Sequence, residues 1–233
     1  MPQKARLAEN MKYAVAIDGP AGAGKSSVAK EVSKRIGFIY VDTGALYRTV
    51  ALYLLNNNIG DNETEKIAEA LKGIEVSMEH KADGQHVFLC GEDVSGLIRT
   101  EPVSMMASTT SALPVVRKFL FDLQVEMAKK YNVLMDGRDI GTVVLPNAQV
   151  KIFLTASAEE RARRRLLEYQ AKGVEADFEK VLADIKKRDD QDMNRQTAPL
   201  KQAEDAVLLD TTALDFNEVC DKMIEIVSSK IPL

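Results

Sequence analysis

The chain contains few residues of the two types that most often build zinc sites and nucleophilic pairs. Among its 233 residues are two cysteines, Cys90 and Cys220, and two histidines, His80 and His86. The cysteines lie far apart in the sequence, which favours free thiols in a reducing cytoplasm over a disulfide framework. Without a Cys/His cluster we expect no zinc site, and no Ser/His or Cys/His catalytic pair is evident.

Long apolar runs and an excess of positive charge are also missing. No apolar run approaches the ~20 residues of a membrane span, so we expect no membrane partner. The formal net charge is −4, which argues against broad nucleic-acid binding. Residues 1–10 lack the apolar core of a signal peptide, and we expect a disordered tail there. The remaining composition, with 45% hydrophobic residues, suits a domain with a large core.

One glycine-rich stretch has the complete pattern of a phosphate-binding loop. Residues 19–26 fit G-x-x-x-x-G-K-[ST], between an apolar strand over 13–17 and a helix over 27–36. The glycines let backbone N–H groups and the helix N-terminus approach anionic oxygens. Lys25 offers a positive charge to the β- and γ-phosphates, and Ser26 a hydroxyl to Mg²⁺. The predicted ATP-binding residues of this loop are Gly19, Pro20, Ala21, Gly22, Ala23, Gly24, Lys25, Ser26 and Ser27.

Strands and helices alternate along the rest of the chain. This order predicts an α/β fold, a doubly wound parallel sheet of about five strands with ligands at the carboxyl ends of the strands. Strands are expected at residues 13–17, 38–41, 132–135, 150–154 and 206–210. Helices are expected at residues 27–36, from 45 onward, and at 63–72, 102–131 with a break near 113–114, 158–172, 178–190 and 216–229.

Two of the predicted strands end in polar segments that suit phosphate chemistry. Residues 42–48, Asp-Thr-Gly-Ala-Leu-Tyr-Arg, open a helix that Asp42 or Thr43 can cap, and Arg48 can grip a phosphate from its first turns. An apolar strand ending in Asp136 is the Walker-B arrangement, which places a carboxylate near Mg²⁺. We therefore predict a magnesium site at Ser26 and Asp136, with contact through water expected and direct ligation left open.

A different pattern interrupts the α/β order. Residues 75–79 and 86–90 alternate apolar and polar side chains around Asp83-Gly84, which predicts an antiparallel hairpin. We predict an inserted subdomain at about 63–110, within a P-loop core formed by residues 11–62 and 111–233. An expected helix carries the cluster Arg161, Arg163, Arg164 and Arg165, which suggests recognition of small polyanions.

Taken together, these motifs resemble the bacterial cytidylate kinases, which belong to the nucleoside monophosphate kinases. The resemblance runs from about residue 13 to the C-terminal helix. A P-loop alone indicates a phosphate binder, whereas Asp-Gly-Arg-Asp after a strand, combined with residues 42–48, is far more discriminating. The stretches that carry the resemblance are residues 17–26, 42–48, 91–95, 98–100, 136–144, 188–190 and 194–195.

The resemblance implies transfer of a phosphoryl group from ATP, with Mg²⁺, to CMP or dCMP. It also implies an inserted subdomain that binds the monophosphate. The implied substrate-binding residues are Thr43, Arg48, Ser108, Arg117, Arg138, Asp139, Arg188 and Asp192. The implied catalytic residues are Lys25, Arg138, Arg188 and Arg195, of which Arg195 would reach the transferring phosphoryl group. The resemblance also implies a lid over about 157–195 that contacts ATP through Arg161 and Arg165. Nothing in the sequence demands more than a monomer.

The chemistry of these residue types agrees with the implied reaction. Cytosine has an amino donor at N4 beside acceptors at N3 and O2, so Asp139 can accept from N4 while Arg117 and Ser108 donate. Uracil has O4 at that place and would set an acceptor against a carboxylate, at a cost of about 1–3 kcal/mol. The acceptor phosphate is already ionised at neutral pH, so positioning and charge neutralisation suffice and no strong base is needed.

Three alternative functions compete with the cytidylate kinase hypothesis. A P-loop GTPase needs an Asn-Lys-x-Asp segment for guanine, which the chain lacks. The segment 63–110 could instead be a partner-binding surface, with or without kinase activity. Another small-molecule kinase of the same fold, acting on UMP, shikimate or pantoate, is the nearest rival, because only the resemblance assigns the pocket to cytidine.

Overall fold

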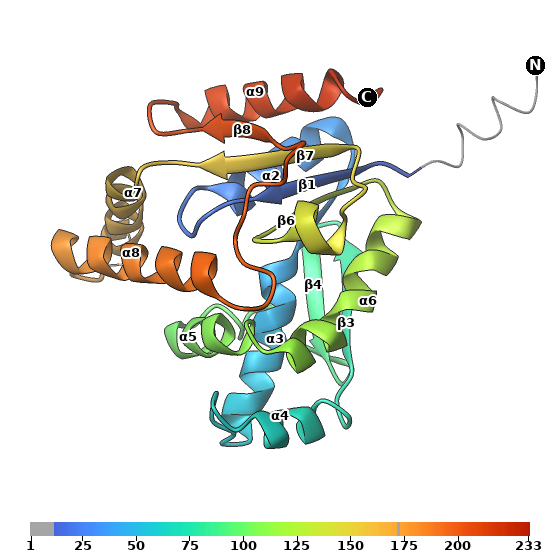
Figure 1. Ribbon diagram of the computed structural model, residues 1–233, viewed down its shortest axis with the longest axis vertical. Helices are drawn as coiled ribbons and strands as arrows, with labels where there is room; N and C mark the ends of the chain where they lie inside the picture. Colours follow the sequence, from blue (N-terminus) through green and yellow to red (C-terminus); the bar gives the residue numbers. More distant parts are fainter. Residues whose placement is uncertain (1–11, 172) are drawn as a thin grey trace, which may run out of the picture.

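The structure, a computed structural model that describes residues 12–171 and 173–233, is built around one parallel sheet (Figure 1). Its strands are β1 (Ala14–Asp18), β2 (Ile39–Asp42), β6 (Val133–Gly137), β7 (Val150–Thr155) and β8 (Val207–Asp210). They pair in the order β2-β6-β1-β7-β8, and every pair is parallel. The predicted doubly wound sheet is confirmed, while the predicted tail at residues 1–10 lies outside the described residues.

Helices cover both faces of this sheet. Successive residues of a strand point to opposite faces, so β1 contributes Val15 and Ile17 to one apolar core and Ala14 and Ala16 to the other. The first core is closed by α2 and α9, and the second by α6 and the π-helix η1. The bounds are α2 (Lys25–Ile36), α6 (Pro114–Lys130), η1 (Ile140–Val144) and α9 (Phe216–Ser228).

Residues 63–110 form a layer beside the sheet, seen below it in Figure 1. The predicted hairpin is present, and a short third strand extends it into an antiparallel sheet in the order β3-β4-β5. The elements are α4 (Thr64–Ala70), β3 (Val76–Lys81), β4 (Gly84–Leu89), β5 (Glu92–Asp93) and α5 (Glu101–Thr110). Their apolar core also contains Leu46 of α3 (Thr43–Asn56) and Leu120 of α6, so both of these helices serve this layer as well. The boundaries 62/63 and 110/111 stay predictions.

Two helices lie beyond the carboxyl ends of the strands, at the left of Figure 1. They are α7 (Ala158–Ala171) and α8 (Phe178–Asn194). They pack on one another through a small cluster around Ala162, Val181 and Ile185, apart from the main cores. A pair of helices with its own small core can change position without opening the sheet, which suits the predicted lid. Among the described residues, no helix is long and apolar enough to cross a bilayer.

Three differences from the predicted elements matter for the site. Helix α3 begins at Thr43 rather than at residue 45, because the Asp42 carboxylate caps it by accepting from the Ala45 N–H at 3.0 Å. Helix α8 continues to Asn194 rather than stopping at 190. The π-helix η1 was not predicted, because its first two N–H groups, those of Ile140 and Gly141, donate to the Asp18 carboxylate at the end of β1.

Candidate active site

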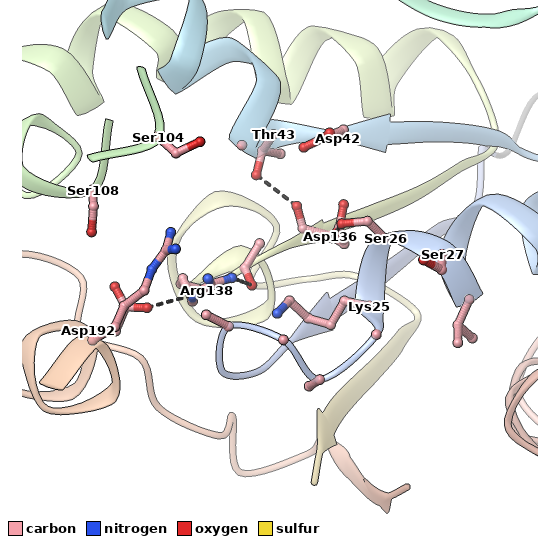
Figure 2. Close-up of a pocket in the computed structure, with 18 of the residues that line it drawn as sticks. Lys25, Ser26, Ser27, Asp42, Thr43, Ser104, Ser108, Asp136, Arg138 and Asp192 are labelled. Atoms are coloured by element: carbon pink, nitrogen blue, oxygen red, sulfur yellow. Dashed lines mark hydrogen bonds and ion pairs between the residues drawn. The ribbon is translucent and has the colours of Figure 1, made fainter. Parts of the chain in front are cut away.

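A cavity of about 640 Å³ lies at the carboxyl edge of the parallel sheet (Figure 2). Open α/β sheets place ligands at this edge, where loops and helix N-termini converge. The strand register brings two carboxylates together here, because Asp42 at the end of β2 pairs with Asp136 in β6. The lining runs from the phosphate-binding loop, past the start of α3, to α5, α6 and the lid helices.

The phosphate-binding loop forms one end of the cavity, with residues 21–27 in its lining. Gly19 lies so close to the neighbouring strand that a Cβ would stand 1.9 Å from the Leu154 carbonyl oxygen, which admits glycine alone. Gly24 adopts φ 89° just before Lys25 opens α2, and it has no side chain to cap that helix. The N-terminus of α2 therefore faces the cavity as an anion-binding group.

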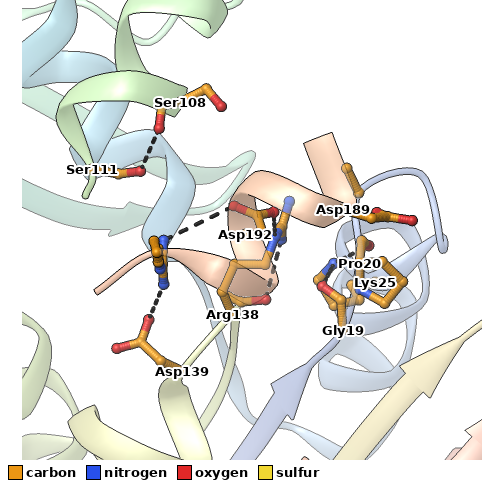
Figure 3. A network of polar contacts seen from close by, with 12 residues as sticks. Gly19, Pro20, Lys25, Ser108, Ser111, Arg138, Asp139, Asp189 and Asp192 are labelled. Atoms are coloured by element: carbon orange, nitrogen blue, oxygen red, sulfur yellow. Dashed lines mark hydrogen bonds and ion pairs between the residues drawn. The ribbon is translucent and has the colours of Figure 1, made fainter. Parts of the chain in front are cut away.

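Lys25 is buried at the centre of this loop (Figure 3). Its Nζ donates to the carbonyl oxygens of Gly19 and Pro20, both at 2.7 Å. Burial and the charge of Arg138 lower the pKa of the Lys25 ammonium well below its ordinary value, while Asp136 and Asp18 oppose that shift. An anion that enters the cavity would favour the charged ammonium and raise this pKa.

Ser26 and Asp136 lie together, as the magnesium prediction requires (Figure 2). The Ser26 hydroxyl donates to Asp136 Oδ2 at 2.9 Å, and the Tyr40 hydroxyl donates to Oδ1 at 2.9 Å. Burial and the nearby Asp42 charge raise the pKa of Asp136 to about 6. A hydroxyl and a carboxylate are hard oxygen donors, which fits Mg²⁺. No cluster of three or more His, Cys, Asp or Glu side chains suited to a metal occurs in residues 12–171 and 173–233, so ATP and water would supply the other ligands.

The middle of the cavity collects guanidinium groups. Arg138 donates from Nε to Asp192 Oδ2 at 2.7 Å, and Arg48 donates from Nη2 to Asp42 Oδ2 at 3.0 Å (Figure 3 shows the first pair). Arg188 lies in the same lining, and burial followed by the charge of Arg138 lowers its pKa. The Nε atoms of Arg48 and Arg188 are both buried without a hydrogen-bond partner in residues 12–171 and 173–233. Unpaired buried donors are costly, so these two nitrogens indicate an anion that belongs here.

Asp139 organises the far end of the cavity. It forms an ion pair with Arg117 Nη2, and its Oδ1 lies 3.3 Å from Arg195 Nη2. Burial raises the pKa of Asp139, while the charges of Arg117, Arg195 and Arg138 act against that shift. Ser108 also lines this end, where the Arg117 guanidinium stacks over the Tyr47 ring at 5.7 Å from the centroid. A carboxylate with flanking donors and an aromatic ring can read the edge and face of a base.

Most of the predicted site residues line this one cavity, but some make contacts that were not predicted. Thr43 lines the cavity, and its hydroxyl donates to the Asp136 carbonyl oxygen at 2.8 Å. Arg195, expected at the transferring phosphoryl, pairs with Asp139 and donates to the Ala198 carbonyl oxygen at 2.7 Å. Gly19 and Pro20 serve mainly as acceptors for Lys25.

The two arginines predicted to contact ATP from the lid, Arg161 and Arg165, lie in different environments. Arg165 lines the cavity, and it contacts Glu168 at 3.2 Å. Arg161 is 4% exposed and lies behind the lining: it forms a bidentate pair with Asp189 and donates to the Ala21 carbonyl oxygen at 3.0 Å. In this structure Arg161 therefore braces the phosphate-binding loop, and its contact with ATP stays a prediction. Arg164, three residues on, is half-buried and lines the cavity.

Several residues of the site escaped the sequence-based prediction. Asp18 accepts from the N–H groups of Ile140 and Gly141, both at 2.7 Å, and so ties the end of β1 to the loop that carries Asp139. Its place directly before the phosphate-binding loop was a usable signal. Arg99 lies in the stretch 98–100 that carries the resemblance, although no role was predicted for it. Gln124 had no signal, because it reaches the cavity only through the packing of α6.

Comparison with known proteins agrees with this geometry. Residues 15–229 match the family model described as cytidylate kinase. A cytidylate kinase of Caldicellulosiruptor saccharolyticus is 51% identical over 92% of this chain and 95% of its own length. That of Bacillus subtilis is 46% identical over 94% and 98%, respectively. A solved structure of an uncharacterized protein from Eubacterium ventriosum shares the fold, with a TM-score of 0.51 at 13% identity over 94% of this chain and 99% of its own.

The match covers the phosphate-binding loop, the arginine-lined middle and the Asp139 end of the cavity together. It also includes the segment 63–110 and the lid helices, so no part of the site falls outside it. On this ground the chain belongs to the cytidylate kinase family.

Proposed function

We propose that the protein transfers the γ-phosphoryl group of ATP to CMP or dCMP, giving CDP or dCDP and ADP. One observation carries the proposal: a single cavity joins the phosphate-binding loop to the Asp139–Arg117 pair through a band of arginines. In that band, the Nε atoms of Arg48 and Arg188 are buried without a partner among the described residues. The phosphates of the two substrates would meet there. A cavity of about 640 Å³ is also large enough for a nucleotide.

The donor end would hold ATP by its phosphates. Backbone N–H groups of residues 21–26 and the α2 N-terminus surround the β-phosphate, and Lys25 leaves its loop carbonyls for the phosphate oxygens. Ser26 and Asp136 would hold Mg²⁺. That ion neutralises charge on the phosphates as the γ-phosphoryl group moves.

The acceptor end would orient CMP for in-line attack. Thr43, Arg48, Arg138 and Arg188 surround its phosphate, and Asp192, held by Arg138, faces the sugar. An oxygen of that phosphate forms the new bond to the γ-phosphorus while the bond to the β,γ-bridging oxygen breaks, and ADP leaves. No proton has to be removed from the acceptor, so positioning by these side chains supplies the catalysis.

Base recognition would rest on Asp139. Its carboxylate accepts from the cytosine N4 amino group, and Arg117 and Ser108 donate to N3 and O2. Because Asp139 is itself held by Arg117 and Arg195, its acceptor oxygens are fixed before the base arrives. Uracil would place O4 against this carboxylate and leave a buried acceptor without a partner.

Water has to be excluded, or ATP would be hydrolysed instead of transferred. The lid helices α7 and α8 carry Arg165 and Arg188 into the cavity, so their closure over both substrates would complete the charge around the phosphoryl group. We propose that the protein acts as a monomer, since each group named here comes from one chain. We also propose that it acts in the cytoplasm.

The test is an ADP-release assay with ATP and Mg²⁺ that compares CMP, dCMP, UMP, AMP, GMP and no acceptor. Strong turnover only with CMP and dCMP is expected. Equal turnover with UMP would keep the kinase and discard the cytosine-reading argument. ADP release that does not depend on any monophosphate would overturn the proposed acceptor.

A further inference from the structure

A second cavity, of about 450 Å³, lies between α2, β2 and the hairpin formed by β3 and β4. Tyr40 stands at its boundary with the active site: it lines the second cavity, while its hydroxyl donates to Asp136 of the first at 2.9 Å. Among the described residues, only Asp42 and Arg99 line both cavities. The second cavity therefore adjoins the active site without being part of it, and the proposed reaction does not use it.

Cations from two elements surround this cavity. Helix α2 begins at the active site with Lys25 and then presents Lys30 and Lys34 to the second cavity. These two lysines lie four residues apart, so they share one face of the helix. The hairpin adds His80 and Lys81 to the lining. A ligand in this cavity would therefore meet basic side chains from both elements.

The positive charge of Lys30 and Lys34 is not neutralised by an ion pair. Glu31, the carboxylate next to Lys30 in the sequence, pairs with Arg35 at 2.7 Å, and in the described part of the chain neither lysine forms such a pair. A helix end favours cations, which accounts for Lys34 in the last turn of α2 but not for Lys30 in its middle. Like charges four residues apart also destabilise a helix slightly, so the two lysines suit an anion that contacts both.

The two carboxylates that line the cavity do not cancel this charge. Asp42 already accepts from the guanidinium groups of Arg48 and Arg99, and Asp83 lies 3.0 Å from Nε2 of His86. A basic cavity therefore exists on a chain whose formal net charge is −4. The local field, and not the overall balance, decides which small molecules such a cavity concentrates.

The floor of the cavity is apolar, in contrast to its basic rim. Four buried side chains form this floor: Phe38, Ala45, Val87 and Ile98. Small-molecule sites usually offer about 300–1,000 Å³ and combine apolar walls with a few polar groups that orient the ligand. An apolar floor beneath a basic rim fits a molecule that joins an aromatic or apolar body to anionic groups, and lysine commonly binds phosphate.

We propose that this cavity is a second ligand site, which takes a small organic molecule with two or more phosphates, the class to which nucleoside diphosphates and triphosphates belong. The phosphates contact Lys30 and Lys34 of α2 and Lys81 of the hairpin, and the body rests on the floor beside Phe38. The described lining contains neither a glycine-rich loop nor a hydroxyl–carboxylate pair like that of the active site, so the site binds its ligand without phosphoryl transfer.

The first experiment measures binding while the active site is filled. The enzyme is saturated with CMP, Mg²⁺ and the β,γ-imido analogue of ATP, and CTP or inorganic tripolyphosphate is then titrated in by calorimetry. The wild type should bind one further equivalent of CTP. Tripolyphosphate should bind about tenfold more weakly, because it has no body to cover the apolar floor. Equal affinity of the two probes would overturn the assignment to an organic phosphate.

Substitution of the two helix lysines tests where the added ligand binds. Lys30→Ala/Lys34→Ala should weaken CTP about 100-fold, from about tenfold for each lost charge-assisted contact. Lys118→Ala/Lys222→Ala is the matched control, because it removes two exposed lysines that lie on α6 and α9, outside the lining, and changes the net charge equally. The control should bind CTP as the wild type does. Equal affinities of the two double variants, or no binding beyond the filled active site, would overturn the proposal.

A second measurement locates the ligand without any substitution. Acetylation of each lysine of the filled enzyme is followed by mass spectrometry with and without CTP. The ligand should slow the reaction of Lys30, Lys34 and Lys81 and leave Lys118 unchanged. Equal slowing at Lys118 would show general screening by CTP, and the proposal would be wrong. Failure of the proposed function is visible separately, because CMP would then give no binding heat before CTP is added.

Discussion

The donor end and the acceptor end of the cavity are built in opposite ways. The proposed donor end is one continuous run, residues 19–27, which would offer a phosphate mainly backbone N–H groups presented by glycines and by the N-terminus of α2. The acceptor end is assembled from side chains of separate elements: Arg48 of α3, Arg117 of α6, Arg138 after β6 and Arg188 of α8. Backbone geometry makes the first end rigid, whereas ion pairs hold the second.

This difference explains where positive charge is satisfied and where it is not. At the donor end, Lys25 has two carbonyl partners and Arg161 is paired with Asp189. At the acceptor end, Arg48 and Arg188 each keep a buried donor without a partner. The donor-end cations named here are paired without a ligand, whereas two guanidinium groups of the acceptor end each keep an unpaired donor.

The largest effect is expected at the donor end, from Lys25→Met. Methionine keeps the length of the side chain but removes the charge that would follow the transferring phosphoryl group. We expect kcat for ADP release with CMP to fall by about 10³-fold or more. The Gly19 and Pro20 carbonyls lose a partner, so a small drop in melting temperature is expected as well. Turnover within tenfold of the wild type would refute the role of Lys25.

Arg161→Ala tests whether the donor end is braced from behind. The change leaves the buried Asp189 carboxylate unpaired, so the free energy of unfolding should fall by about 3–5 kcal/mol. Arg163→Ala is the control, because Arg163 is 65% exposed and pairs only with Glu160 at 3.5 Å. Exposed pairs of this kind contribute about 0–1 kcal/mol. Equal unfolding midpoints in urea for the two variants would contradict the bracing role.

Asp18 connects the two ends and should make stability depend on pH. Burial raises its pKa to about 6, with the Asp139 charge adding to the shift and the N–H groups of Ile140 and Gly141 opposing it. A carboxyl group whose pKa is higher in the folded state favours folding most below its unfolded pKa, near 3.8. This contribution is lost as pH rises through about 6, and the whole change amounts to about 3 kcal/mol.

The matched comparison for this prediction is Asp18→Asn, which does not titrate. Between pH 4 and pH 7 the wild type should lose about 2–3 kcal/mol of unfolding free energy relative to the variant, measured by urea denaturation. At any one pH the variant also lacks one acceptor for Ile140 or Gly141, so only the slope is diagnostic. Parallel profiles would show that Asp18 is ionised normally in the folded protein.

The smallest effect, and the most selective, is expected from Asp139→Asn. An amide can present either an acceptor or a donor to the base, so discrimination between CMP and UMP should fall about 10- to 100-fold in kcat/KM. KM for ATP should stay within about twofold, because Asp139 lies at the far end of the cavity from residues 21–27. Unchanged discrimination would assign base reading to another group, of which the buried Gln124, with its unpartnered Oε1, is the nearest candidate.

The sequence predicted the elements of the parallel sheet and the hairpin because their signals are local. Apolar runs of four or five residues, glycines at fixed spacing and a turn at Asp83-Gly84 each depend on near neighbours. The same holds for the phosphate-binding loop and for Asp42 as a helix cap. The π-helix η1 could not be predicted in this way, since Asp18 holds its first N–H groups from 122 and 123 residues away.

By itself, the sequence determined which residue types could serve phosphate chemistry and in which loops they lie. The tertiary structure alone decided which arginines face the cavity. Arg161 and Arg165 are four residues apart on one helix, yet the first is buried against Asp189 and the second lines the cavity. The physical reason is that a guanidinium donor takes whichever acceptor the packing brings within reach. Arg161 meets a carboxylate of α8 and a loop carbonyl, while Arg48 and Arg99 meet a carboxylate that they must share.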